Sequence, residues 1–324
     1  MPQPGSITIH ETVIAEPGAG PYDVTRGPDG ALWITMVHAG RIARLTDDGQ
    51  LDSYPLTPAG CGPSIITTGP DGALWFTRNR DHRIGRITPG GETSSFDVPT
   101  PEAGPFGITT GADGALWFTE MNSDRIGRLD PEDGTVTEHP LPVAGAFAAA
   151  ITAGVDDALW FTLNQANAIG RITLTGQITL HPLPTAGAAP VGICRDTDGA
   201  LWFVEIAAGQ IGRLGPGGRV EEFPLPDRAA RPHAITADPT GDGCWYTAWA
   251  TGRVGHISPN GHIEEFDLPT STGEPHGLTV TPDGTVHVAL EAGLLARLAR
   301  QQPGGAQASV RAARGDGRDP HGPA

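Results

Sequence analysis

The 324-residue sequence has little of several features that define large protein classes. Its three cysteines, Cys61, Cys194 and Cys244, are an odd number without metal-site spacing, which favours free thiols in a reducing compartment. Lysine and arginine total 21 against 37 acidic residues, and the net charge of −16 opposes binding to nucleic acid or anionic membranes. The N-terminus lacks the pattern of a signal peptide, and no apolar run reaches membrane length. These absences predict a soluble, cytoplasmic protein with neither nucleic-acid nor membrane partners.

Aromatic residues are also few, at 6%, yet most of the tryptophans recur at a nearly fixed interval. They follow one another after 42 or 43 residues, at Trp33, Trp75, Trp117, Trp160, Trp202 and Trp245, and one further step reaches His287. Similar text surrounds each position, with GPxGIT first, then DGALWFT, RIGRI and a run that ends in PLP. Several short strand-like runs in a repeat of this length are typical of a β-propeller. The sequence therefore predicts an all-β, seven-bladed propeller with the tryptophans in its core.

Each repeat predicts four strands, which in the third repeat cover residues 105–109, 115–119, 125–129 and 135–142. The last repeat stops after LLARL and lacks an outer strand, whereas ITIHETVI (residues 7–14) resembles an outer strand and stands before the first repeat. We expect the N-terminal strand to complete the last blade, which leaves no open sheet edge. Residues 1–300 then form one propeller domain. Residues 301–324, which are rich in glycine, alanine, arginine and proline, are expected to be a disordered tail.

Departures from the repeat point to a functional site. The loops that enter the inner strands gather on one face around the axis, together with the loops that leave the second strands. At the inner-strand entrance the sequence places, in blade order, Tyr22, Ser64, Phe106, Phe147, Val191, His233 and His276. The two histidines lie in adjacent blades, and Tyr22 lies beside them once the ring closes.

The exits of the second strands add further side chains. Four positions past the repeat tryptophan or its equivalent, blade 6 has Trp249 and blade 7 has Glu291. Glu274 precedes His276 by two residues, a spacing that in an extended segment turns both side chains to the same side. We therefore predict an asymmetric cluster of six residues: Tyr22, His233, Trp249, Glu274, His276 and Glu291.

Other ionisable residues have simpler explanations. Glu120 and Glu205 follow the repeat consensus and are expected to be structural, and His287 at a tryptophan position is expected to be packed. His38 points toward the same rim and is a minor candidate. The remaining internal histidines fall on turns or outer strands, at His10, His82, His139, His181, His256 and His262.

Two carboxylates, with water and substrate oxygens, suit Mg²⁺ better than Zn²⁺, which favours nitrogen and sulfur ligands. A neighbouring histidine is a natural general base because its ordinary pKa lies near neutrality. A metal bound to a carbonyl acidifies the adjacent C–H bond. The residue chemistry allows either metal-assisted hydrolysis of an ester or proton abstraction followed by elimination, and it does not choose between them.

The repeat text also resembles a known family. The segments PYDVT, ALWFTEMNSDRIGRL, ALWFTLNQANAIGRI, ALWFVEIAAGQIGRL, RPHAIT and EPHGL are similar to the streptogramin B lyases, also called virginiamycin B lyases. The similarity covers roughly residues 6–299. It implies a lyase that linearises streptogramin B-type cyclic depsipeptide antibiotics by elimination at the threonyl ester, requires Mg²⁺ and confers antibiotic resistance.

The resemblance also assigns roles to the predicted cluster. It implies His276 as the general base, Glu274 and Glu291 as metal ligands, and His233, Tyr22 and Trp249 as substrate-binding residues. Ala248 stands where the repeat favours glutamate, and His287 replaces an aromatic residue, but both departures lie outside the four ionisable positions.

Two alternatives stay open. One is a propeller lactonase that uses the same carboxylates to hydrolyse a cyclic ester, although blades 2 to 4 lack the larger ligand set of such sites. The other is a non-catalytic propeller that binds a peptide or protein, since this scaffold hosts many binding modules. The expected partner is a small cyclic depsipeptide, and a closed ring gives no reason to expect anything but a monomer.

Overall fold

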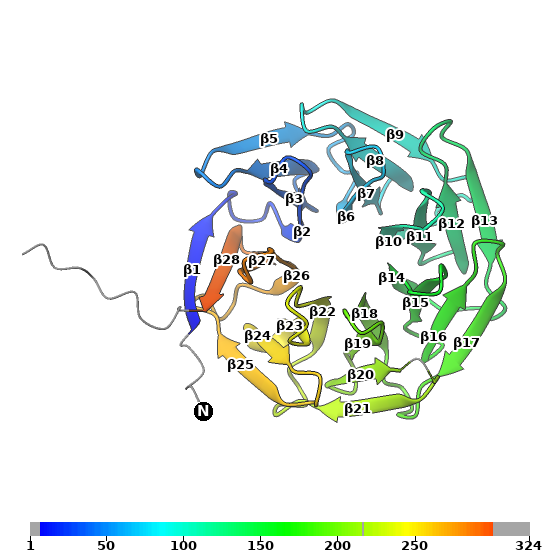
Figure 1. Ribbon diagram of the computed structural model, residues 1–324. Coiled ribbons are helices and arrows are strands. Elements are labelled where there is room, and N and C mark those ends of the chain that lie inside the picture. The colour runs from blue at the N-terminus through cyan, green and yellow to red at the C-terminus, as the bar shows by residue number, and fades with distance from the viewer. Residues whose placement is uncertain (1–6, 216, 301–324) are drawn as a thin grey trace, which may run out of the picture.

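The computed structural model describes residues 7–215 and 217–300 as seven four-stranded antiparallel sheets arranged in a ring (Figure 1). The predicted seven-bladed β-propeller is thereby confirmed. The tail predicted at residues 301–324 lies outside the described residues. Within the described part of the chain, no helix is long and apolar enough to cross a membrane.

The blades are numbered here in the chain order of their inner strands. Blade 1 contains β2 (Pro21–Arg26), β3 (Leu32–Met36), β4 (Arg41–Leu45) and β5 (Leu51–Pro55). Blade 2 contains β6 (Pro63–Thr68), β7 (Leu74–Arg78), β8 (Arg83–Ile87) and β9 (Thr93–Asp97). Blade 3 contains β10 (Pro105–Thr110), β11 (Leu116–Glu120), β12 (Arg125–Leu129) and β13 (Val136–Pro140). Blade 4 contains β14 (Ala148–Ala153), β15 (Leu159–Leu163), β16 (Ala168–Ile172) and β17 (Ile178–Pro182).

The remaining three blades complete the ring. Blade 5 contains β18 (Pro190–Arg195), β19 (Leu201–Glu205), β20 (Gln210–Leu214) and β21 (Val220–Pro224). Blade 6 contains β22 (Pro232–Ala237), β23 (Cys244–Ala248), the short 3-10 helix η1 (Trp249–Thr251), β24 (Arg253–Ile257) and β25 (Ile263–Asp267). Blade 7 contains β26 (Pro275–Val280), β27 (Val286–Leu290), β28 (Leu294–Arg300) and, on its outside, β1 (Ile7–Val13).

The ring closes at blade 7 as predicted, because the N-terminal strand β1 pairs with β28 from Ile7↔Arg300 to Val13↔Leu294 (Figure 1). The same strand is fastened to the neighbouring blade by a side chain. The Glu11 carboxylate accepts hydrogen bonds from the backbone N–H of Thr270 at 3.0 Å and from its hydroxyl at 2.6 Å. The strand β1 therefore completes blade 7 and contacts the segment that leads from blade 6 into blade 7.

The repeated tryptophans are buried in the core, as predicted, except that Trp160 is partly exposed. In blade 1, the Trp33 indole donates to Asp29 at 3.0 Å, and Arg44 from the third strand donates to the same carboxylate at 2.7 Å. A ring from the outer strand, Tyr54, stacks on Trp33 with centroids 5.7 Å apart. His139 and His181 occupy this outer-strand position in blades 3 and 4. Their role is to pack on tryptophan, which agrees with their assignment outside the site.

A second-strand threonine links each of several blades to the next. The Thr247 hydroxyl accepts from the N–H of Ala234 at 3.0 Å and donates to the carbonyl of His276 at 2.8 Å. Ala234 lies where the pairing of β22 with β23 shifts register, so this hydroxyl satisfies a backbone group that the ladder leaves free. The contact fixes the backbone of His276 relative to blade 6.

Candidate active site

Each blade presents two neighbouring residues at one end of the ring. One residue immediately precedes the inner strand and has a positive φ; the series is Gly20, Gly62, Gly104, Phe147, Ala189, Arg231 and Glu274. Its carbonyl accepts the N–H of the residue that leaves the second strand; that series is Val37, Asn79, Met121, Asn164, Ile206, Trp249 and Glu291. These hydrogen bonds place the strand entrances and exits on one face, as the sequence predicted, and blade 7 contributes a glutamate from each series.

One position in the predicted series was wrong. Phe147 has a positive φ of 53° and lies before the inner strand of blade 4, so it corresponds to Gly104 of blade 3. The position equivalent to Phe106 is occupied by Ala149, since the hydroxyl of Thr119 donates to the Ala149 carbonyl just as that of Thr77 donates to Phe106. Blade 4 has Ala148 where most blades have proline, and the missing proline caused the two-residue error.

Three rings predicted for the site lie in contact. Tyr22 stacks on His276 with centroids 4.6 Å apart and an interplanar angle of 30°. His233 meets His276 edge to face at 4.8 Å, and its ring centroid lies 6.0 Å from that of Tyr22. Burial strongly raises the pKa of Tyr22, so its phenol stays protonated at neutral pH. Burial, reinforced by the neighbouring His276, lowers the pKa of His233 to about 3. His233 is therefore a neutral imidazole that can donate or accept a hydrogen bond but carries no charge.

Glu291 is hydrogen-bonded to two imidazoles. Its Oε2 lies 2.6 Å from Nε2 of His276, and its Oε1 lies 2.6 Å from Nε2 of His38. The hydrogen bond from His276 is the main reason that the pKa of Glu291 falls to about 2, so this carboxylate is ionised at neutral pH. His38, a minor candidate in the sequence, thus contacts a residue of the predicted cluster directly.

Glu274 belongs to the cluster, but not through the extended backbone that was predicted. Its φ is 51°, so the segment from Glu274 to His276 is not extended, and the expected reason for the shared side does not apply. The side chain is nevertheless brought to the other two, since Glu274, His276 and Glu291 each offer a ligand atom and these atoms lie within 4.8 Å of one another. A left-handed backbone costs a residue other than glycine about 1–2 kcal/mol. Phe147, Ala189 and Arg231 have the same conformation in blades 4 to 6, so the cost is common to four blades.

These three residues fit a hard divalent cation. Two carboxylates supply the oxygen ligands that Mg²⁺ prefers, and Glu274 is exposed on the open face. Each carboxylate oxygen has two acceptor sites, so Glu291 can accept an imidazole N–H and still offer a lone pair to a cation.

Trp249 is the sixth predicted residue. It begins η1 and occupies in blade 6 the position that Glu291 holds in blade 7, with its N–H bound to the carbonyl of Arg231 at 3.2 Å. The Arg231 guanidinium lies over the indole, 5.8 Å from the ring centre. No described residue accepts a hydrogen bond from the buried indole Nε1.

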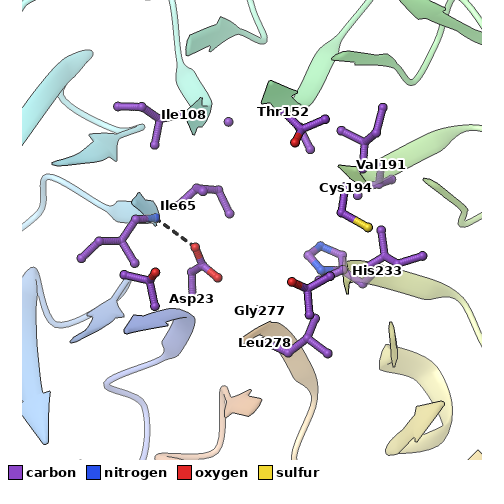
Figure 2. A pocket seen from close by; sticks show the side chains of 18 of the residues that line it. Asp23, Ile65, Ile108, Thr152, Val191, Cys194, His233, Gly277 and Leu278 are labelled. Atoms are coloured by element: carbon purple, nitrogen blue, oxygen red, sulfur yellow. Dashed lines mark hydrogen bonds between the residues drawn. The ribbon is translucent and has the colours of Figure 1, made fainter. Parts of the chain in front are cut away.

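A cavity of about 280 Å³ runs along the axis below this cluster and is lined by inner-strand residues of all seven blades (Figure 2). Tyr22 and His233 belong to its wall, whereas the two glutamates do not. Asp23 and His233 point into it from blades 1 and 6 (Figure 2). Sequence reasoning missed Asp23, which is buried, accepts the N–H of Ile66 at 2.9 Å and has its pKa raised by burial to about 7.

The residues set aside in the sequence lie elsewhere. Glu120 and Glu205 are fully buried and bonded within their own blades, to Ser123 at 2.6 Å and to Gln210 at 2.6 Å respectively. His287 is half-buried opposite Thr279 at the tryptophan position, and burial lowers its pKa to about 4.

Comparison with known proteins agrees with the resemblance seen in the sequence. A 56-residue segment is 55% identical to the virginiamycin B lyase of Saccharopolyspora erythraea; the match spans 17% of this chain and only 19% of that relative. A solved streptogramin B lyase structure is 41% identical with a TM-score of 0.88, over 91% of this chain and 98% of that chain. A catalytically inactive histidine-to-alanine variant of the Staphylococcus aureus virginiamycin B lyase, solved with quinupristin, is 41% identical with a TM-score of 0.87, over 90% of this chain and 99% of that chain.

The sequence profile that describes the virginiamycin B lyase family matches residues 7–298 of this chain. This range runs from the strand that closes the ring to the last strand of blade 7, and it includes all six residues of the predicted cluster. The chain therefore belongs to the virginiamycin B lyase family.

Proposed function

We propose that this protein is a Mg²⁺-dependent lyase that linearises streptogramin B-type cyclic depsipeptides by eliminative cleavage of the threonyl ester. The observation that carries the proposal is the convergence of Glu274, His276 and Glu291, whose ligand atoms lie within 4.8 Å of one another beside Tyr22 and His233. The family relationship supports the substrate class, since the Staphylococcus aureus relative was solved with quinupristin.

His276 is the proposed general base. Its Nε2 donates to the carboxylate of Glu291, so the lone pair that takes the threonyl α-proton is on Nδ1, which has no hydrogen-bond partner among the described residues. The C–H electron pair becomes a double bond between the α- and β-carbons, and the β-carbon–oxygen bond breaks with its electrons on the departing carboxylate. Glu291, 2.6 Å away, stabilises the imidazolium that His276 becomes. That a relative of this chain is inactive as a histidine-to-alanine variant is consistent with an essential histidine.

The other side chains bind and orient. Glu274 and Glu291 would hold Mg²⁺, which when bound would polarise the carbonyl next to the threonyl α-carbon and make the α-proton more acidic. In this proposal, neutral His233 donates a hydrogen bond to the substrate, and the rings of Tyr22 and Trp249 provide apolar contact to it. Tyr22 also holds the His276 ring in its orientation by stacking on it.

The decisive experiment incubates the purified protein with a streptogramin B antibiotic and Mg²⁺, followed by liquid chromatography and mass spectrometry, with an EDTA control. Elimination opens the ring without adding atoms, so we expect a new peak of unchanged mass that EDTA abolishes. A product heavier by one water would show hydrolysis and establish a lactonase instead. Complete absence of a product would contradict the proposed substrate class.

A further inference from the structure

A second side chain of the strand-exit loop also differs among the blades. The residue that follows each strand-exit position donates its N–H to the loop before the inner strand; the series is His38, Arg80, Asn122, Gln165, Ala207, Ala250 and Ala292. Blades 1 to 4 thus have long polar side chains here, whereas blades 5 to 7 have alanine. At this end of the ring, the strand-exit loops of blades 1 to 4 therefore present polar side chains, and those of blades 5 to 7 present alanine.

In blades 1 and 2 these side chains lie close to the glycine that precedes the inner strand. A Cβ added to Gly20 would lie 2.6 Å from the His38 ring, and one added to Gly62 would lie 2.8 Å from the Arg80 side chain. Blade 7 has the reverse arrangement, with Glu274 at the left-handed position and only Ala292 beside it. Glycine in blades 1 and 2 thus makes room for the side chains of His38 and Arg80.

The hydrogen bonds of His38 determine its tautomer. The Arg80 guanidinium, 3.0 Å from Nδ1, can only donate, so Nδ1 of His38 must be the acceptor. The ring hydrogen is then on Nε2, which donates to Oε1 of Glu291 at 2.6 Å. Arg80, His38 and Glu291 form a directed chain that begins in blade 2, crosses blade 1 and ends in blade 7.

We propose that His38, held by Arg80, is a positioning residue that orients the Glu291 carboxylate for cation binding. The inference rests on the proposed function in taking Glu291 as a Mg²⁺ ligand. A carboxylate that accepts a hydrogen bond from His38 on one oxygen and from His276 on the other has a fixed plane, and one of its oxygens stays within 4.8 Å of a Glu274 oxygen. Hydrogen-bond partners that orient a metal ligand are typically worth 10–100-fold in affinity.

The first test measures Mg²⁺ binding to the substrate-free protein by isothermal titration calorimetry. His38→Ala should weaken binding by about 10-fold. His38→Gln should restore most of the affinity, because its amide nitrogen can donate to Glu291 while its oxygen accepts from Arg80. Asn122→Ala is the matched control, an exposed residue at the same position in blade 3 that bonds to the Glu102 carbonyl. Unchanged affinity in His38→Ala, or a glutamine variant as weak as alanine, would overturn the proposal.

For a substitution of Arg80, the direction of the change in Mg²⁺ affinity distinguishes two roles of this residue. If Arg80 acted only through its charge, Arg80→Met would strengthen cation binding, because a positive charge near the site is removed. The positioning role predicts weaker binding in the wild-type background and no further weakening in His38→Ala. Stronger binding in Arg80→Met alone would contradict the chain of hydrogen bonds.

A third measurement separates this proposal from the function on which it rests. Long-range ¹⁵N–¹H NMR spectra of the metal-free protein should show His38 with its hydrogen on Nε2, and Arg80→Met should remove that preference. If the wild-type protein binds no Mg²⁺, the metal dependence of the proposed function is wrong. The NMR spectrum then still tests whether Arg80, His38 and Glu291 are hydrogen-bonded as described. Hydrogen on Nδ1 of His38 in the wild-type protein would refute it.

Discussion

Tyr22 and His276 stack on each other with ring centroids 4.6 Å apart, although one belongs to the first blade and the other to the last. The contact therefore exists only in the closed ring. Because His276 also meets His233 and Glu291, the stack with Tyr22 is one of three contacts that orient the proposed base.

This stack predicts different effects for two substitutions of Tyr22. Tyr22→Phe retains a ring over His276 and should keep most of the wild-type kcat/KM. Tyr22→Leu loses an aromatic pair worth about 0.5–1.5 kcal/mol, which should lower kcat/KM roughly 2- to 10-fold. Steady-state kinetics on both variants would distinguish the ring from the hydroxyl. Equal losses in the two variants would assign the role to the hydroxyl instead.

His276→Ala should lower turnover by about 10²–10⁴-fold, which is the usual contribution of a positioned base. The variant should still fold, because it keeps the backbone carbonyl that Thr247 binds, although loss of the buried ring should lower its free energy of unfolding. The measurement is single-turnover kinetics together with thermal unfolding. His262→Ala, at an exposed position on a turn, serves as the control and should retain full activity. Wild-type turnover in His276→Ala would remove this residue as the base.

Glu274→Gln should raise the Mg²⁺ concentration needed for half-maximal activity, because a neutral amide is a weaker ligand than a carboxylate. Activity at saturating Mg²⁺ should recover at least in part. Glu264→Gln on the outer strand is the matched control and should titrate like the wild-type protein. An identical Mg²⁺ titration for Glu274→Gln would show that this residue is not a ligand.

Asp23 should make stability depend on pH. Its pKa is raised by burial from 3.8 to about 7, so between these values the folded protein holds a proton that the unfolded chain releases. The free energy of unfolding should fall as pH rises through this window and level off above it. A shift of this size corresponds to at most about 4 kcal/mol.

Urea unfolding at several pH values, compared between the wild-type protein and Asp23→Asn, measures this effect. Glu120 and Glu205 also have pKa values raised to about 7 by burial, so both proteins should retain some dependence. The free energy of unfolding of Asp23→Asn minus that of the wild-type protein should increase from acidic to neutral pH. A constant difference would mean that Asp23 does not hold its proton in the folded state.

Gly277→Ala tests the contact between blades 7 and 1. A Cβ at this position would lie 2.0 Å from Oδ1 of Asp23 and 2.7 Å from its Cα, so the backbone must shift. We expect a loss of about 1–3 kcal/mol in the free energy of unfolding. Gly60→Ala, where a Cβ meets nothing within 4 Å, should have little effect. Equal free energies of unfolding for the two variants would show that the backbone between blades 7 and 1 adjusts to the added Cβ at little cost.

The repeat made the fold predictable, because the period and its strand text are both local in sequence. It also identified Tyr22, His233, His276 and Glu291 as departures at positions that one face brings together. The register failed at Phe147, where a missing proline removed the landmark. Glu274 was chosen correctly, but on the assumption of an extended backbone that its positive φ does not have.

The remaining features depend on contacts between blades, which the repeat does not encode. The sequence offered His38 only as a minor candidate, and nothing in it linked Arg80 to the site, since their partners lie in other blades. Asp23 follows Tyr22 directly, yet its burial in the axial cavity and its raised pKa arise from packing of the whole ring.

The pairing of β1 with β28 also sets the order in which the protein can be completed during synthesis. The first strand leaves the ribosome early but must wait for the last strand to emerge before it has a partner. Glu274, His276 and Glu291 are translated near the end of the propeller, while Tyr22 and His38 are translated near its beginning. A prematurely terminated chain that lacks the last blade has neither a closed ring nor these three residues, so release of a partial product yields no partially active protein.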